Sequence, residues 1–171
     1  VLDAAENSGR QLRRLSDSAI RLNQALADED LYQQLADSLR ETIGAHQALV
    51  SLNIGESFAQ HIHAVSFSAK YAKWKDYATQ ADGSGIYALV GETNRPLRMT
   101  QAELEAHPRW RGFGAHAAEH PPMRGWLAVP LIGSDGANIG QLQLSDKLRG
   151  EFSEEDELVA VQFAQMASIA I

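Results

Sequence analysis

Two segments joined by a turn make up the stretch WLAVPLIGSDGANIGQLQLSDK, residues 126–147. The second segment alternates apolar and polar residues, which is the periodicity of a strand with one face in a core. The first segment places Leu127 and Val129 opposite in phase to Trp126. The link SDGAN, residues 134–138, contains the Asp-Gly pair that favours a hairpin turn. This stretch therefore predicts two long antiparallel strands at the centre of the fold.

The segments on either side of this hairpin show strand and helix periodicities. Residues 31–43 carry leucine or isoleucine at helical spacing, whereas residues 46–55 alternate like a half-buried strand. A second strand is expected at 60–68, and a short edge strand at 95–100. A last helix is expected from Ser153, with apolar residues around most of its circumference. Together these elements predict an α+β fold.

Residues 145–157, SDKLRGEFSEEDE, carry a dense set of charges between the last strand and the last helix. Ser153 and Asp156 have the spacing of a helix capping box, so most of the carboxylates need no catalytic explanation. Lys147 can pair with Asp156 across the loop, a contact worth about 1 kcal/mol or less if partly exposed. Phe152 is expected to insert under the loop. We interpret the cluster as a structural connection between strand and helix.

This cluster resembles the signature of GAF domains, the small-molecule sensory modules of phosphodiesterases, phytochromes and bacterial signalling proteins. The residues that carry the resemblance are Lys147, Phe152, Asp156 and Glu157. The resemblance implies a central antiparallel sheet of five or six strands. It also implies N- and C-terminal helices on one face of the sheet, and loops and short helices on the other. In the family the lysine–aspartate contact is structural and lies away from the ligand. Asp146 stands where the signature has asparagine.

The chain divides into a connector, residues 1–29, and a GAF-like sensory domain, residues 30–171. Within the connector, leucines three to seven residues apart form a narrow apolar stripe, at Leu12, Leu15, Leu22 and Leu26. Such a stripe suits one partner helix, either in the same domain or in a second copy of the chain. The last helix has no stop signal, so we expect it to continue beyond Ile171. These features favour a homodimer paired through its terminal helices.

Composition argues against several classes of function. The 171 residues contain no cysteine, which removes thiol catalysis and thiolate metal sites. In the GAF family, which this chain resembles, the modules that attach bilins and those that reduce methionine sulfoxide depend on thiols. The resemblance therefore implies neither role for a chain without cysteine. The net charge of -7 and the lack of a basic block argue against nucleic acid as a partner. No apolar run is long enough to span a membrane. We expect a cytoplasmic domain without membrane contact.

Neither a catalytic site nor a metal site is expected. His61 and His63 share one face of a strand, and His116 and His120 share one side of a helical turn. No third ligand stands at fixed spacing from either pair, so structural or solvent roles are favoured over metal binding. A serine elbow and a phosphate-binding loop are also missing. No cofactor is predicted, although an unidentified small-molecule ligand is.

The sheet face away from the terminal helices is the candidate ligand site. Its small, amide and aromatic side chains, with those of a covering loop, are typical of ligand pockets. The residues predicted to line it are Ser51, Asn53, Tyr87, Trp110, Phe113, Trp126, Gln141 and Gln143. Arg109 and Arg111, beside Trp110, could favour a small anion or remain solvated. Alternatively, the aromatic residues fill a second small core.

The sequence thus predicts a regulatory, small-molecule-sensing domain of a signal-transduction protein. The expected parent is a bacterial two-component sensor histidine kinase, and ligand state would pass through paired terminal helices. The alternative is a ligand-free dimerisation or docking module whose pocket is filled by its own side chains. In neither case is the domain itself expected to be an enzyme.

Overall fold

An antiparallel sheet of five strands forms the centre of the computed structural model, which describes residues 9–17, 31–55, 58–76, 85–112 and 114–171. The strands lie in the order β2-β1-β5-β4-β3, and each neighbouring pair is antiparallel. Their bounds are β1 Ala45–Asn53, β2 Gln60–Phe67, β3 Leu97–Met99, β4 Trp126–Ile132 and β5 Asn138–Lys147. The predicted antiparallel sheet is confirmed.

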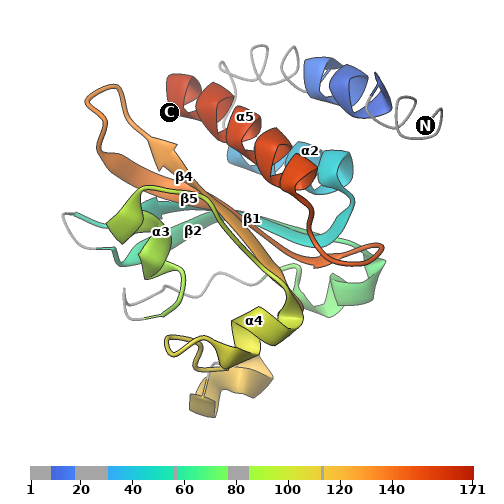
Figure 1. Cartoon of the computed structure of the whole chain (residues 1–171), viewed down its shortest axis with the longest axis vertical. Coiled ribbons are helices and arrows are strands. Elements are labelled where there is room, and N and C mark those ends of the chain that lie inside the picture. Colours follow the sequence, from blue (N-terminus) through green and yellow to red (C-terminus); the bar gives the residue numbers. More distant parts are fainter. Residues whose placement is uncertain (1–8, 18–30, 56–57, 77–84, 113) are drawn as a thin grey trace.

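Two helices cover one face of the sheet, here called the back face, and shorter helices lie on the opposite, front face (Figure 1). The back-face helices are α2 Leu31–Ile43 and α5 Glu154–Ala170. The shorter helical segments are η1 Ala69–Trp74, α3 Ala88–Thr93, α4 Gln101–Ala106 and η2 Gly114–Glu119. A further helical segment spans residues 9–17. This is the α+β arrangement expected from the sequence.

The main core lies between the back face and the helices α2 and α5. Val50, Leu142 and Val129 are neighbours across β1, β5 and β4, and all three are fully buried. Leu39 of α2 and Phe163 of α5 belong to the same cluster. Since residues of one phase along each strand share a face, this apolar set determines which face of the sheet the helices cover.

Helix α5 begins at the predicted capping box. Ser153 Oγ accepts a hydrogen bond from the Asp156 backbone N–H at 3.2 Å, and the Asp156 carboxylate accepts one from the Ser153 N–H at 2.8 Å. Lys147 Nζ donates to Asp156 Oδ1 at 2.7 Å and to the Ile43 carbonyl at 2.6 Å. Phe152 is buried under this loop. The motif therefore connects the ends of α2 and β5 to the start of α5.

The last residue of the motif connects α5 to the edge of the sheet. Glu157 Oε2 lies 3.0 Å from Nε of Arg98, a residue of the short edge strand β3. Nη1 of Arg98 also donates to the Phe152 carbonyl at 3.4 Å. Two of the carboxylates at the start of α5, Asp156 and Glu157, thus have structural partners.

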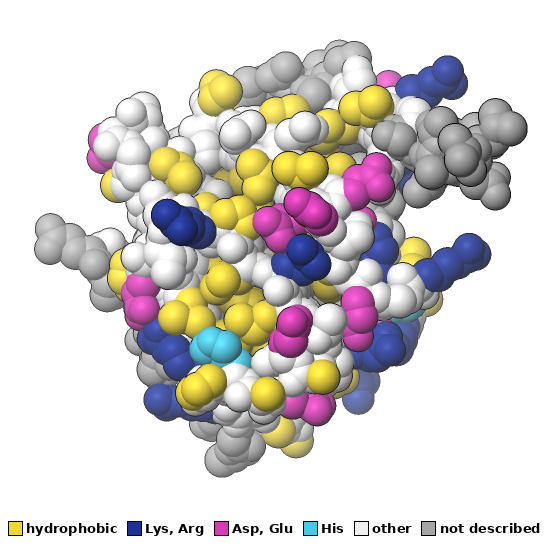
Figure 2. All heavy atoms as spheres, viewed as in Figure 1, with side chains coloured by type: hydrophobic (Ala, Val, Ile, Leu, Met, Phe, Trp, Pro, Cys, Tyr) yellow, Lys and Arg dark blue, Asp and Glu magenta, His cyan; other side chains and the backbone are white. Residues whose placement is uncertain are grey.

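The outer side of α5 leaves apolar side chains exposed. Leu158 and Ile169 are 61% and 89% exposed in the single chain. Figure 2 shows apolar side chains gathered over this part of the molecule. In the helical segment 9–17, Leu15 packs against the main core, whereas Leu12 is 62% exposed. The other two leucines of the predicted stripe, Leu22 and Leu26, lie outside the described residues.

Candidate functional site

The front face of the sheet has two halves, and the half over β4 is apolar. Trp126 and Ala128 are fully buried there. Trp126 Nε1 donates a hydrogen bond to Gln143 Oε1 at 3.0 Å, so the polar atom of the indole is satisfied within the protein. The other buried members of this cluster are Ile86, Val90 and Leu104. This half is a second small core, as the alternative interpretation of the aromatic residues stated.

The covering segment adds aromatic side chains to this second core. Tyr87 and Trp110 pack against the cluster, while Phe113 lies outside the described residues. Arg109 donates from Nη1 and Nη2 to the two carboxylate oxygens of Glu92, at 2.8 and 2.9 Å. Its charge is therefore already paired. The suggestion that Arg109 favours an anionic ligand gains no support from this geometry.

The half of the front face over β2, β1 and β5 contains three polar side chains that are closed to solvent. Ser51, Gln60 and Gln141 are each no more than 1% exposed. Ser51 Oγ donates to Gln60 Oε1 at 2.8 Å, and Gln141 Nε2 donates to the same oxygen at 3.0 Å. Buried polar side chains from three adjacent strands thus meet at one oxygen atom.

The hydrogen-bonded chain continues from Gln60 to the end of the β4–β5 hairpin. Gln60 Nε2 donates to Asn53 Oδ1 at 3.3 Å, and Asn53 Nδ2 donates to the carbonyl and side-chain oxygens of Asn138, both at 2.9 Å. Asn138 Nδ2 in turn donates to Oδ1 of Asn94, the residue that ends α3, at 3.1 Å. We call this set the amide relay, and its members are Ser51, Gln60, Gln141, Asn53, Asn138 and Asn94.

One atom of the amide relay is left without a partner. Gln141 Oε1 is buried and accepts no hydrogen bond from any residue in the described ranges. A buried polar atom left unpaired costs about 1–3 kcal/mol, so such atoms are few in folded proteins, and a bound water, ion or ligand commonly accounts for them. The side chains of the relay carry no formal charge. This half of the front face therefore offers hydrogen bonding to a ligand without offering an ion pair.

The sequence pointed to Ser51, Asn53 and Gln141 but missed Gln60, at which the hydrogen bonds converge. A signal was present, because Gln60 begins the predicted second strand and pairs with Asn53 in the register of β1 and β2. Asn138 was assigned to turn chemistry, in which asparagine is common. Local patterns did not reveal its contact with Asn53, 85 residues away.

A second polar cluster surrounds Asp146, at the opposite end of β5. Its buried carboxylate accepts hydrogen bonds from Lys70 and from Tyr71 Oη, the latter at 2.8 Å, and Arg124 Nη1 lies at 3.6 Å. Burial opposes ionisation, but the bonds from Lys70 and Tyr71 outweigh it and lower the pKa of the carboxyl. Burial and the bond to Asp146 raise the pKa of Tyr71. Asp146 thus attaches η1 to the sheet.

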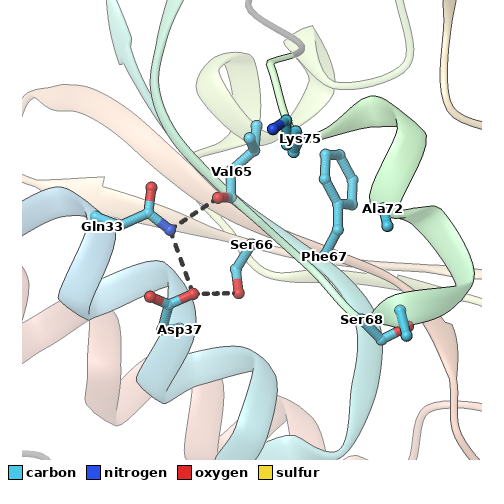
Figure 3. Close-up of a pocket in the computed structure, with 9 residues that line it drawn as sticks. Gln33, Asp37, Val65, Ser66, Phe67, Ser68, Ala72 and Lys75 are labelled. Carbon is cyan, nitrogen blue, oxygen red and sulfur yellow. Dashed lines mark hydrogen bonds between the residues drawn. The ribbon is translucent and has the colours of Figure 1, made fainter.

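A groove of about 360 Å³ lies beside β2, the strand at one edge of the sheet, between α2 and η1 (Figure 3). Gln33 Nε2 donates to the Val65 carbonyl at 2.8 Å, and Asp37 accepts a hydrogen bond from Ser66 Oγ. Side chains of α2 therefore pair polar groups of the edge strand, which protects it from other strands. Because these groups satisfy one another, the groove is a weaker candidate site than the amide relay.

The histidines of β2 form an aromatic cluster. The rings of His61 and His63 lie 4.9 Å apart, and the Tyr32 ring of α2 lies 4.7 Å from that of His63. Burial, followed by the charge of His61, lowers the pKa of His63. Across the described part of the chain, no three His, Cys, Asp or Glu side chains are grouped as metal ligands would be. The side chain of His116 is not among those described.

The five-stranded sheet, with helices α2 and α5 on one face and shorter helices on the other, defines a small α+β domain. The GAF domain family model matches residues 29–171, and the chain belongs to this family. Among the described helices, none has the length and apolar content needed to cross a membrane.

Solved structures show the same fold at low sequence identity. The chain is similar to the GAF domain of a phosphoenolpyruvate-protein phosphotransferase from Coxiella burnetii, with 22% identity, a TM-score of 0.76, and coverage of 96% of this chain and 95% of that one. A methyl-accepting chemotaxis protein matches with 14% identity, a TM-score of 0.72 and coverage of 90% and 93%. A free methionine-R-sulfoxide reductase from Neisseria meningitidis, in complex with its substrate, matches with 18% identity, a TM-score of 0.67 and coverage of 91% and 87%.

Proposed function

We propose that this GAF domain senses a small molecule and regulates a signal-transduction protein, with a two-component sensor histidine kinase as the parent. The observation that carries the proposal is the amide relay, whose central side chains are closed to solvent and keep an unpaired acceptor. A packed core gains nothing from such groups, whereas a site that orients a small ligand uses a few of them.

The sheet offers a short route from the front face to the terminal helices. In β5, Gln141 belongs to the front face, and the next residue, Leu142, lies in the main core with α2 and α5. In β1, Ser51 likewise belongs to the front face, and its neighbour Val50 lies in the main core. A ligand that prefers one position of these two strands would therefore shift the population of helix arrangements on the back face.

The terminal helices are the proposed output of the domain, paired in a homodimer. Leu158 and Ile169 expose apolar surface on one side of α5, and Leu12 does so on the helical segment 9–17. Exposed apolar side chains at helical spacing suit a partner helix, here that of a second copy. Ligand state would then pass along the paired helices. We place the domain in the cytoplasm, with neither nucleic acid nor membrane as a partner.

A ligand-free dimerisation or docking module is the second candidate. The apolar half of the front face favours it, because Trp126 is fully buried and its Nε1 already has a partner in Gln143. That half of the predicted pocket is occupied by the protein's own side chains. Under this alternative, the amide relay would be structural as well, and no small molecule would stabilise the domain.

We propose a regulatory role in preference to a catalytic one. One structural relative is a reductase, but the 171 residues of this chain contain no cysteine, so a thiol cannot serve as nucleophile or reductant. Within the described ranges, the fully buried carboxylates are Asp146 and Asp156, and both are engaged in ion pairs. Neither is free to act on a substrate.

A thermal-shift screen of nucleotides and small metabolites tests the proposal, because a ligand that binds only the folded state raises its apparent stability. The gain is about 2.7 kcal/mol at a ligand concentration of 100 Kd. Stabilising compounds are then tested on Gln60→Met, in the amide relay, and on Asp37→Asn, in the β2 groove. We expect the shift to be lost in the first variant and kept in the second. The absence of any stabilising compound, or equal shifts in both variants, would contradict the proposal.

A further inference from the structure

The amide relay is anchored by two backbone carbonyl groups. Asn53 Nδ2 lies 2.9 Å from the carbonyl oxygen of Asn138, and Asn94 Nδ2 lies 3.2 Å from that of Gly136. A carbonyl oxygen can only accept a hydrogen bond, so each side-chain amide must direct its NH₂ group toward it. The orientations of Asn53 and Asn94 are therefore determined by the backbone.

The orientation of the Asn53 amide determines the orientation of the next amide groups in the relay, those of Gln60 and Gln141. Because its NH₂ group is committed, Asn53 presents Oδ1 to Gln60, which must present Nε2 in return. Gln60 Oε1 then lies on the other side, where it accepts from Ser51 Oγ and Gln141 Nε2. A flipped Gln141 would place two carbonyl oxygens against each other at about 3 Å, which is repulsive. The orientation of Gln141 is therefore also determined.

The one atom of the relay that has no hydrogen-bond partner in the described part of the chain is an acceptor. Gln141 Oε1 is buried, and no donor among the described residues reaches it. Since the other orientation of the amide is blocked, the chain cannot satisfy this oxygen by rotating the group. The partner that would satisfy it is a donor from outside the relay.

The surroundings of Gln141 limit the chemistry of that donor. An anion would meet a carbonyl oxygen instead of a hydrogen-bond donor, and a cation would be buried beside side chains that carry no charge, which is costly. In the strand register, Gln141 lies opposite Ser51 of β1 on one side and opposite Pro130 of β4 on the other. Strand β4 carries the apolar half of the front face. An uncharged ligand with an apolar or aromatic body fits both neighbours.

We propose that the front face binds an uncharged ligand whose N–H or O–H group donates a hydrogen bond to Gln141 Oε1. The inference rests on the proposed function, and it names the ligand class of the same site. Gln141 is fully buried, so elements above it move when the ligand enters. Helix α3 is such an element, because it contacts β4 and β5 and the amide relay ends at its last turn, on Asn94.

Three small probes of matched shape test the inference in the whole chain: benzamide, N,N-dimethylbenzamide and benzoate. The first is an uncharged donor, the second lacks the N–H group, and the third is an anion. Titrations followed by ¹H–¹⁵N NMR should show benzamide perturbing the Trp126 indole and the glutamine side-chain amides. We expect it to bind about fivefold to tenfold more tightly than N,N-dimethylbenzamide, which is the effect of one hydrogen bond. Benzoate should bind more weakly than benzamide.

Two methionine variants make the test specific. Gln141→Met removes the acceptor and should abolish the preference for benzamide, whereas Gln165→Met, the same change at an exposed position of α5, should keep it. Gln141→Met should also keep a melting temperature close to that of the wild type, because removing the unpaired buried oxygen offsets the loss of the bond from Nε2 to Gln60 Oε1. A loss of stability well beyond the value of that one hydrogen bond would show that the oxygen already has a partner, and it would overturn the inference.

The remaining outcomes separate the inference from the proposed function. Equal front-face binding of benzamide and N,N-dimethylbenzamide would overturn the donor requirement and leave the ligand site standing. If none of the three probes perturbs the front face, the inference is overturned, and the metabolite screen decides the proposed function independently.

Discussion

Asp146 is buried, has a left-handed backbone with φ of 58°, and accepts hydrogen bonds from two residues of η1. Aspartate and asparagine tolerate this backbone better than most residues, because their short side chains can form local hydrogen bonds. The asparagine of the GAF signature would fit the same backbone. What aspartate adds is a negative charge, which faces Lys70 and Arg124.

The contribution of this charge to stability should depend on pH. We expect Asp146→Asn to lower the free energy of unfolding by about 1–2 kcal/mol at pH 7, since Tyr71 loses a charged acceptor. The pKa of the folded-state carboxyl is depressed. Its contribution is therefore present above the unfolded-state pKa, about 3.9, and is lost as pH falls through the folded-state value. Denaturant unfolding from pH 7 down to pH values of about 2 should show the difference in free energy of unfolding between the two proteins closing in acid. A constant difference would show that the charge of Asp146 does not contribute to stability.

Gly140 of β5 lies directly against the backbone of β1. A Cβ atom at this position would lie 2.2 Å from the Ser51 carbonyl oxygen and 2.9 Å from Leu52 Cα, and backbone atoms of a central strand cannot move away easily. Gly140→Ala should therefore reduce the free energy of unfolding by about 2 kcal/mol or more in urea titrations. Gly9→Ala is the control, because nothing lies within 4 Å of that Cβ. Wild-type stability of Gly140→Ala would show that the two strands are further apart.

At the scale of elements, one ammonium group joins three of them. Lys147 Nζ, at the end of β5, binds the last carbonyl of α2 and the Asp156 carboxylate in the first turn of α5. The side chains of Lys147 and Asp156 are only 16% and 3% exposed. The value of about 1 kcal/mol inferred from the sequence applies to exposed pairs and is too low for this degree of burial.

Removing the ammonium group should therefore have a large effect. We expect Lys147→Met to lower the free energy of unfolding by about 2–4 kcal/mol, because Asp156 is left as a buried charge without its partner. Arg149→Met, two residues further along and exposed, should stay within about 0.5 kcal/mol of the wild type. Chemical denaturation of the three proteins measures both effects. Equal stabilities of the two variants would mean that the pair does not hold α5 in place.

At the scale of the whole molecule, the exposed side of α5 is the proposed dimer contact. Ile169→Glu should weaken dimerisation, because it places a charge in an apolar contact between helices. Light scattering during size-exclusion chromatography at several concentrations measures the change in mass. Leu148→Glu is the control, since it adds the same charge at an exposed leucine outside α5. Loss of the dimer in both variants, or a wild-type chain that is monomeric at high concentration, would contradict this contact.

Short-range patterns predicted the strands, the capping box of α5 and the two faces of the sheet, because alternation and turn chemistry act over a few residues. They did not predict the amide relay as a network. The hydrogen bonds of Gln60 depend on the register between β1 and β2, which shifts between Val50 and Ser51. The contact of Asn53 with Asn138 joins residues 85 positions apart. Such contacts follow from the packed sheet and have no local signature.

The central claim is that the front face of the sheet binds a small molecule. The most direct test is ¹H–¹⁵N NMR of the whole chain with each compound that raises the melting temperature. The account predicts perturbations centred on the side-chain amides of Gln60 and Gln141, followed by smaller ones in α5. Perturbations confined to the β2 groove, at Gln33 and Lys75, would contradict it, and so would a chain that no compound stabilises.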